Sequence, residues 1–403
     1  MSKIVLFENK KDCCGCSACM NICPKSAISM KTDERGFLYP QIGERICVEC
    51  GACKTVCAYK IGPEERKEKP YCYAFTNNNS EELGRSSSGG AFSAIMDAIY
   101  EFEGEKTIVF GSAIDENFYV VHMSASERKD CDKFCTSKYV QSDLSDCYKQ
   151  VEGSLRSDKA VLFTGTPCQI AAVRSYISRR KITDNKFYAV DIICHGTPSP
   201  GLWKDYVSWM ESKYGKMKKF SFRYKAAGWK GYPAMAAFEN GKVLINNIYT
   251  QVFTTLFFTH KVLRESCYSC QYANLNRPGD LSIGDYWGAE YILQNEISKG
   301  MFDPKQGISE ILVNTDKGNR LIEEIRISNW CVLSSTDAYI KYQHNLNCPT
   351  DRPKETDLLW KEYKKNGADY IIKKYGGLSV KQRIKRSIPQ PIKEMLKKTL
   401  QRK

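Results

Sequence analysis

Eight cysteines within the first sixty residues constrain this 403-residue chain more than any other feature. They form two runs of identical spacing, C-x-x-C-x-x-C-x-x-x-C, which hold Cys13, Cys16, Cys19 and Cys23 and then Cys47, Cys50, Cys53 and Cys57. In such a run, three thiolates on a tight loop bind three irons of one [4Fe–4S] cluster, and the fourth thiolate points away to bind the other cluster. The spacing therefore predicts two [4Fe–4S] clusters.

The same run is typical of bacterial two-cluster ferredoxins. Exchange of the fourth ligand predicts two sets of cluster ligands, which are Cys13, Cys16, Cys19 and Cys57 in the first set and Cys47, Cys50, Cys53 and Cys23 in the second set. Pro24 follows the first run as the motif requires, whereas Ala58 at the equivalent place is a departure. We predict a two-[4Fe–4S] ferredoxin domain over residues 1–60 and a charged linker over 61–70.

Two other interpretations of these cysteines compete with this one. Disulfides would need an oxidising compartment, and the N-terminus reaches Glu8 too soon for a signal peptide. Zinc would explain pairs of C-x-x-C cysteines but not two triplets that are each followed by a fourth cysteine. Nineteen cysteines without a secretion signal therefore indicate reduced thiols, metal binding and a cytoplasmic location.

The positive charge of the chain is concentrated at its C-terminus. Of the net charge of +14, residues 381–403 contribute +8, because nine basic residues there face Glu394 alone. A basic surface for nucleic acid is therefore not required, and we predict no nucleic-acid partner. Apolar residues recur near helical spacing beside the basic ones, so the predicted basic helical tail at 351–403 offers a candidate peripheral contact with a membrane or an acidic partner. A solvated, partly disordered end is the favoured interpretation of this tail.

Beyond the linker, patterns of strands and helices alternate, which predicts a larger mixed-sheet α/β domain over residues 71–350. Helices are predicted from residue 91 onward and over 170–177, 202–214 and 317–327. Strands are predicted over 71–75, 107–112, 119–125, 160–164, 187–193, 220–224, 234–238, 242–248, a segment ending at 285, and 308–314. Asn240-Gly241 predicts a hairpin turn.

Four further cysteines stand at predicted turns. Cys168 and Cys194 each follow a buried strand, and Cys267 and Cys270 form a C-x-x-C pair. Groups at the carboxyl ends of strands gather at one edge of an open α/β sheet. Four such thiolates can hold a third [4Fe–4S] cluster, but from spacing alone zinc binding, idle thiols or buried packing residues explain them as well. The other cysteines, Cys14 included, have no partner spacing and are predicted to pack in the core.

A segment of serines and glycines, Ser86-Ser-Ser-Gly-Gly90, leads into the helix predicted from residue 91. Hydroxyls and free N–H groups at a helix N-terminus suit a phosphate, although Ser and Gly also serve as ordinary caps. Lys138 and Tyr139 lie in a polar loop, where a solvated lysine is the simpler interpretation.

Taken together, these segments resemble the coenzyme F-420 hydrogenase/dehydrogenase beta-subunit family. The resemblance covers about residues 71–347. It rests on motifs that occur in the order Ser86–Phe92, Ser137–Ser142, Phe163–Ile170, Asp191–Gly196, and Cys267-x-x-Cys270 through Gly284-Asp-Tyr-Trp-Gly288. Several motifs in register are far more specific than any single one.

The resemblance implies an iron–sulfur and flavin oxidoreductase domain that holds FAD and a proximal [4Fe–4S] cluster. It implies that the ligands of this third cluster are Cys168, Cys194, Cys267 and Cys270. The implied flavin contacts are Ser88, Gly89, Gly90, Lys138 and Tyr139. His195 is a candidate for orienting a cluster sulfur or the flavin, and a structural hydrogen bond is equally compatible with it.

The sequence leads to the hypothesis of a flavin- and iron–sulfur-dependent oxidoreductase. Electrons from a ferredoxin or another redox donor protein would cross three clusters to FAD and reach an organic two-electron acceptor, either deazaflavin coenzyme F-420 or another small-molecule substrate. The ferredoxin run at the N-terminus is a departure from the simplest family members and leaves the deazaflavin open. The alternative is an electron-relay subunit of a larger redox or polysaccharide-biosynthesis complex, without a substrate site of its own.

Overall fold

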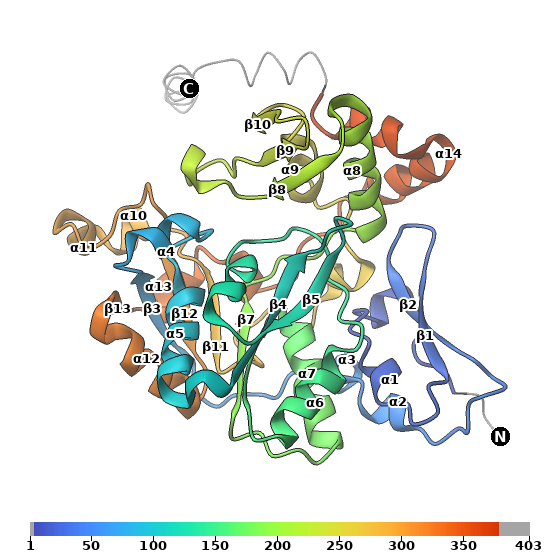
Figure 1. The fold of residues 1–403 in the computed structure, drawn as a ribbon, viewed down its shortest axis with the longest axis horizontal. Helices are drawn as coiled ribbons and strands as arrows, with labels where there is room; N and C mark the ends of the chain where they lie inside the picture. Colours follow the sequence, from blue (N-terminus) through green and yellow to red (C-terminus); the bar gives the residue numbers. More distant parts are fainter. Residues whose placement is uncertain (1–3, 379–403) are drawn as a thin grey trace.

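The computed structural model describes residues 4–378. The basic tail that the sequence analysis singles out lies, from residue 379 onward, outside the described residues. In Figure 1 the N-terminal segment stands beside the edge of a large sheet, and the end of the described chain lies near the smaller sheet above it. Within residues 4–378, no helix combines the length and the apolar character needed to cross a bilayer.

The cysteine-rich N-terminal segment is built around one hairpin. Its strands β1 (Ile28–Thr32) and β2 (Leu38–Ile42) pair antiparallel, with Ile28 opposite Ile42. Three short helices carry or follow the cysteine runs, namely α1 (Ala18–Asn21), α2 (Ala52–Thr55) and α3 (Ala58–Ile61). The sequence analysis did not predict this hairpin, because its strands are short and half-exposed and carry little hydrophobic pattern.

The central sheet has eight strands in the order β13-β3-β12-β11-β7-β6-β4-β5. Neighbours from β4 through β6 and β7 to β11 run parallel, and the strands on both flanks run antiparallel. The strands are β3 (Tyr71–Thr76), β4 (Thr107–Ile114), β5 (Val120–Ala125), β6 (Ala160–Gly165), β7 (Phe187–Ile192), β11 (Leu281–Asp285), β12 (Ser309–Val313) and β13 (Trp330–Ser334). This sheet confirms the predicted mixed α/β fold.

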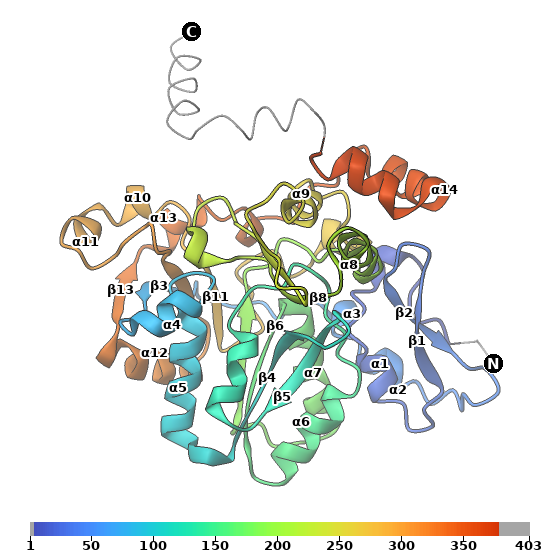
Figure 2. The ribbon, with the colours of Figure 1, turned by 45° about the horizontal axis from the view of Figure 1, so that its top comes forward.

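Helices cover both faces of the sheet, as Figures 1 and 2 show. On one face α5 (Ala91–Glu103) and α12 (Asp316–Ser328) pack on Leu162, Val190 and Ile311. On the other face α6 (Cys147–Arg156) and α7 (Pro167–Arg179) pack on a different set of strand side chains that includes Phe163. Because β6 and β7 are buried on both faces, they read in the sequence as continuous apolar runs. The short helices are α4 (Ser80–Arg85), α10 (Ala289–Ile292), α11 (Gln294–Ser298) and α13 (Thr336–Ile340).

A second, smaller sheet lies above the central one in Figure 1 and has the order β10-β9-β8. Its aromatic core is continuous with Phe37 and Tyr39 of the N-terminal hairpin. The hairpin predicted at Asn240-Gly241 joins β9 to β10. The elements of this unit are β8 (Met217–Ser221), β9 (Met235–Phe238), β10 (Val243–Ile245), α8 (Pro200–Tyr214), α9 (Gln251–Phe258) and α14 (Thr356–Tyr375).

The contact between the N-terminal hairpin and α8 depends on two glycines without side chains. Gly201 donates its N–H to the carbonyl of Gly36 at 3.2 Å, and a Cβ built on Gly201 would lie 2.7 Å from the Cα of Gly36. Backbone atoms in such a contact cannot move apart without a substantial cost in free energy.

Replacing Gly201 by alanine is therefore expected to lower the free energy of unfolding by about 1–3 kcal/mol. Gly153 in α6 is the matched control, because a Cβ there meets no atom within 4 Å. Gly153→Ala is expected to raise helix stability by about 0.5–1 kcal/mol. Thermal midpoints of the anaerobically purified variants measure both effects, and a fall in both variants would contradict this account.

Candidate functional site

The two cysteine runs adopt the same backbone conformation. Gly15 and Glu49, which precede the second cysteine of each run, have φ of 69° and 55°. Ser17 and Gly51, which follow it, have φ of 64° and 75° and cap α1 and α2. Left-handed backbone at Glu49 and Ser17 is unfavourable for residues with a side chain and persists only where the surroundings demand it. The sequence repeat is thus a repeat of loop geometry.

Each predicted set of N-terminal ligands lines one cavity. The first cavity is lined by the thiols of the first set, together with Cys14 and Cys53, and is otherwise mainly apolar. Burial raises the pKa of Cys13, Cys19 and Cys57. The second cavity is lined by all four thiols of the second set, Cys23, Cys47, Cys50 and Cys53. Its Cys50 is exposed, unlike the other predicted cluster ligands.

The other four predicted ligands also meet, although they come from distant parts of the chain. Cys168 lies in the first turn of α7, Cys194 follows β7, and Cys267 and Cys270 lie at a 3₁₀ turn over Glu265–Ser269. These four thiols line a third cavity, to which the N-terminal segment adds Cys14. Because β6 and β7 are parallel neighbours, their carboxyl ends bring Cys168 and Cys194 to one edge.

Hydrogen-bond donors around the third cavity can stabilise thiolates. The Gly196 N–H donates to Cys194 Sγ at 3.4 Å, and the Thr197 N–H donates to Cys267 Sγ at 3.4 Å. Hydrogen bonds to sulfur are one of the means by which proteins tune iron–sulfur clusters. No three His, Cys, Asp or Glu side chains among residues 4–378 are close enough to hold a single metal ion. In a cluster each thiolate binds a different iron, so its ligands need not converge on one point.

The cavities form a series because neighbouring ones share residues. Cys53 lines the second and the first cavity, and Cys14 lines the first and the third. Cys194 and His195 line the third cavity and also a much larger one. A continuous path therefore leads from the exposed Cys50 to the large cavity. The sequence predicts that Cys14 packs in the core, and its place between two ligand sets follows only from tertiary structure.

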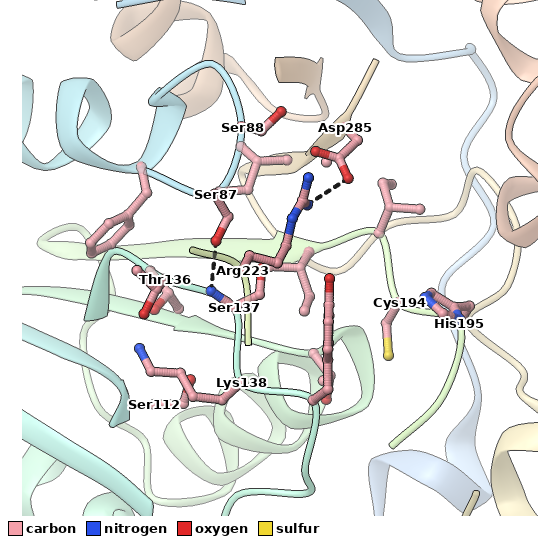
Figure 3. A pocket seen from close by; sticks show the side chains of 18 of the residues that line it. Ser87, Ser88, Ser112, Thr136, Ser137, Lys138, Cys194, His195, Arg223 and Asp285 are labelled. Atoms are coloured by element: carbon pink, nitrogen blue, oxygen red, sulfur yellow. Dashed lines mark hydrogen bonds and ion pairs between the residues drawn. The ribbon is translucent and has the colours of Figure 1, made fainter. Parts of the chain in front are cut away.

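The large cavity has a volume of about 480 Å³ and lies where β6, β7 and β11 end. Its size is that of a typical ligand or cofactor pocket. Serines and the first residues of α5 form a polar wall, which includes Ser86, Ser87, Ser88, Gly90 and Ala91. Aromatic side chains form another wall, which consists of Tyr139, Tyr232, Phe257, Phe258 and Trp287. Figure 3 shows Lys138 and Ser112 on one side of this pocket and Cys194 with His195 on the other.

Two cationic side chains face the cavity in different electrostatic states. Burial lowers the pKa of Lys138 to about 7, and its Nζ donates to the carbonyl of Lys133 at 2.6 Å. Arg223 is nearly buried and forms an ion pair with Asp285 at 2.7 Å (Figure 3). Its Nη2 and the Oδ1 of Asp285 are buried without a hydrogen-bond partner among the described residues. These two unsatisfied atoms can still bind a ligand.

His195 is held as a neutral ring. Burial, followed by the charges of His260 and His344, lowers the pKa of His195 to about 4. Its ring lies 4.6 Å from that of Phe257 and is stacked 5.7 Å from that of Phe258. His195 therefore continues the aromatic wall beside Cys194 and carries no charge at neutral pH.

Five of the six residues implied as flavin or orienting contacts line the large cavity, namely Ser88, Gly90, Lys138, Tyr139 and His195. Gly89 does not, because its Cα packs against β3 and β12, where a Cβ would lie 2.3 Å from the Phe75 carbonyl oxygen. The Ser88 hydroxyl donates to the Ile308 carbonyl at 3.0 Å, which leaves its lone pairs free to accept. Arg223 was not predicted, because a single arginine near a strand carries no spacing signal.

Comparison with known proteins supports both parts of the sequence analysis. Residues 158–338 match the family model for the C terminus of the beta subunit in coenzyme F420 hydrogenase/dehydrogenase. Residues 12–61 match the model of a 4Fe-4S dicluster domain.

Individual relatives are distant. The F subunit of the F(420)H(2) dehydrogenase from Methanosarcina mazei is 22% identical over 189 residues, which are 45% of this chain and 53% of that protein. The match thus spans about half the length of that relative. The solved structure of the F420-reducing [NiFe] hydrogenase complex from Methanosarcina barkeri contains a chain with a TM-score of 0.44 and 20% identity, over 81% of this chain and 96% of that one. The family resemblance seen in the sequence is confirmed, and the chain joins a 4Fe-4S dicluster domain to a C-terminal domain of the coenzyme F420 hydrogenase/dehydrogenase beta-subunit family.

Proposed function

We propose that this protein is an iron–sulfur flavoprotein oxidoreductase. It takes electrons from a ferredoxin or another redox donor protein and passes them through three [4Fe–4S] clusters to FAD and an organic two-electron acceptor. The observation that carries the proposal is the unbroken series of three thiol-lined cavities that ends at the large cavity. A chain that only stored iron would not need such a series.

The proposed ligand sets follow the cavities. The second set, whose Cys50 is exposed to a docking donor, would hold the cluster at which electrons could enter. The first set and then, past Cys14, the third set of Cys168, Cys194, Cys267 and Cys270 would hold the next clusters of the series. Buried thiols with raised pKa values, such as Cys19 and Cys194, bind iron as thiolates because the metal displaces their protons.

The large cavity fits FAD by the chemistry of its walls. The N-terminus of α5 has no side-chain cap, so its first N–H groups can bind an anion such as the pyrophosphate. The aromatic wall, with Tyr139 stacked on Phe257 at 4.6 Å, suits one face of a flat ring. Lys138 and the free Nη2 of Arg223 can balance negative charge. A bound flavin accepts electrons singly and releases them as a pair.

The residues of the chain then perform separate tasks. Arg223 is held by Asp285, so its guanidinium can orient a ligand without rearranging. Lys138, with a pKa of about 7, can hold or release a proton at Nζ near neutral pH. The neutral ring of His195 stands between the third ligand set and the cavity and keeps water from that junction.

The proposed acceptor is coenzyme F420 or another small molecule. The name of the curated relative points to coenzyme F420, and the cavity also fits another small molecule. The alternative is a relay subunit without a substrate site, which is favoured by the fact that the curated relative is named as a subunit. The large, partly unsatisfied cavity favours the oxidoreductase. We place it in the cytoplasm because its thiols must stay reduced.

Analysis of iron, acid-labile sulfide and flavin in the anaerobically purified full-length protein tests the proposal. We expect about twelve irons and about one FAD per chain, because three four-iron clusters and one flavin site are proposed. About eight irons with no flavin would overturn the oxidoreductase proposal and favour the relay subunit. A visible spectrum of the same sample separates flavin absorption from that of the clusters.

A further inference from the structure

Arg264 differs from the other buried arginines in having no carboxylate partner. Three arginines in the described part of the chain are at most 7% exposed. Arg223 pairs with Asp285, and Arg277 pairs with Asp191. Arg264 is 1% exposed and forms no ion pair with any residue in 4–378. Burying an unpaired cation is very costly, so a structure that keeps one must supply negative charge in another form.

The contacts of Arg264 fix its guanidinium between the N-terminal segment and the larger domain. Its Nε donates to the Cys13 carbonyl at 2.8 Å, and its Nη2 donates to the Leu38 carbonyl at 3.0 Å. Its Nη1 donates to Oε1 of Gln141 at 3.0 Å. The guanidinium also lies 4.0 Å from the ring centre of Tyr39. These partners are all uncharged, so they orient the cation without neutralising it.

The position of the guanidinium relative to the thiols suggests its true counter-charge. Nη2 lies 3.8 Å from Cys13 Sγ, in the first ligand set. Arg264 also lines the third cavity, three residues before Cys267. Gly15 makes this approach possible, because a Cβ at Gly15 would lie 2.6 Å from Nη1. One fixed cation thus stands at the boundary between the first and third cavities.

We propose that Arg264 is the counter-charge of the clusters held by the first and third ligand sets and raises their reduction potentials. Each cluster gains one electron and one negative charge when it is reduced, and a buried cation at close range stabilises that form. The cation thereby favours reduction of the two inner clusters over reduction of the cluster held by the exposed second set. This inference rests on the proposed function, since it requires that the clusters are bound.

The test is a redox titration of full-length protein, followed by electron paramagnetic resonance, in variants that change the charge at this point. Arg264→Gln removes the charge and keeps hydrogen-bond donors. Arg264→Lys keeps the charge. Gln141→Glu places a carboxylate 3.0 Å from Nη1 and neutralises the cation in place. Arg35→Gln is the matched control, because Arg35 lies on the N-terminal hairpin that Arg264 contacts but is partly exposed and paired with Glu265.

We expect Arg264→Gln to shift the reduction equilibrium of the first cluster at least tenfold toward the oxidised form, which is about 59 mV for one electron. Gln141→Glu should shift it in the same direction. Arg264→Lys and Arg35→Gln should stay close to the native value. The second cluster serves as the internal reference, because Arg264 contacts none of its ligands.

Iron content separates failure of this inference from failure of the proposed function. About eight irons in the native protein would show that the third cluster is absent and would overturn the proposed function. That result would not concern the contact between Arg264 and Cys13. Full iron content with unchanged potentials in both Arg264→Gln and Gln141→Glu would overturn the role of Arg264. Equal shifts of the first and second clusters would overturn it as well. Should Arg264→Gln lose the first cluster, Gln141→Glu and Arg264→Lys still decide, because each retains a basic residue at position 264.

Discussion

Alanine in place of Cys194 is expected to remove about four of about twelve irons per chain and to stop the reduction of bound flavin by a protein donor. Cys194 is the thiol shared by the third cavity and the large cavity, so its loss interrupts the series at the flavin side. A cluster with three protein ligands in a site open to the neighbouring cavity is poorly retained. The N-terminal clusters, whose ligands lie elsewhere, should remain.

The measurement combines iron analysis with stopped-flow reduction under anaerobic conditions. Flavin content should stay close to native, and direct chemical reduction of the flavin should persist, which shows that the cavity is intact. Cys14→Ala is the sharpest control, because Cys14 lines the same third cavity without belonging to a predicted set. It should keep about twelve irons. Full iron in Cys194→Ala, or loss of four irons in Cys14→Ala, would refute the proposed ligand set.

The cysteine sets could be predicted from the sequence because their chemistry fixes their spacing. Two identical runs within sixty residues specify which thiols share a loop, and the exchanged fourth ligands follow from that loop geometry. The third set was predicted less directly. Cys168 and Cys194 follow apolar runs that become neighbouring parallel strands, so strand order brings them together. Cys267 and Cys270 join them only through the fold, and the family resemblance was needed to group all four.

The parts of the fold that escaped prediction are those in which long-range packing decides. Strand β13 is itself an edge strand of the central sheet, where it pairs with β3, and it is half-exposed, so its apolar pattern is weak. The strand expected over 220–224 lies instead at Met217–Ser221, because a bulge between Met217 and Lys219 shifts the buried positions. Helix α14 falls within the helical tail predicted at 351–403, but its interruption at Gly367, with φ 76°, was not predicted.

The electrostatic residues of the site were the least predictable. Arg223 and Arg264 are ordinary arginines in the sequence. Only the structure shows that Arg223 pairs with an aspartate, whereas Arg264 pairs with no carboxylate among residues 4–378. Gly89 and Gly90 are adjacent and alike in sequence. Yet Gly90 lines the cavity with φ 84°, while Gly89 packs against the sheet. Motif membership alone does not separate a ligand contact from a packing contact.

Glu310 is expected to make the protein less stable as pH rises, and Glu310→Gln should remove that dependence. Its side chain, on the second residue of β12, is fully buried, and neither carboxyl oxygen has a hydrogen-bond partner among the described residues. Burial raises the pKa of Glu310 from 4.5 to about 8. Tyr339 and Arg277 lower the pKa and oppose this rise, whereas Asp191 and Asp285 add to it, and the buried Cys72 also faces the carboxyl group.

The sign follows from proton binding in the two states. Between pH 4.5 and about 8 the folded protein keeps the Glu310 proton and the unfolded chain has lost it, so a rise in pH favours unfolding. From about pH 6 to about pH 8.5 this group should cost about 2.5 kcal/mol of stability. Glutamine mimics the protonated acid and cannot titrate, so the difference in stability between Glu310→Gln and the native protein should grow in favour of the variant over that range.

Thermal midpoints of both proteins, measured anaerobically in the same buffers, check this expectation. Comparing the two proteins cancels the pH dependence that other buried groups contribute. One such group is His122, whose pKa is lowered to about 4 and which both proteins share. Glu323→Gln is the matched control, because the Glu323 side chain is 63% exposed and carries the same chemical change. It should follow the native protein at every pH. Parallel pH profiles of the native protein and Glu310→Gln would show that Glu310 is ionised in the folded state and that its burial is compensated.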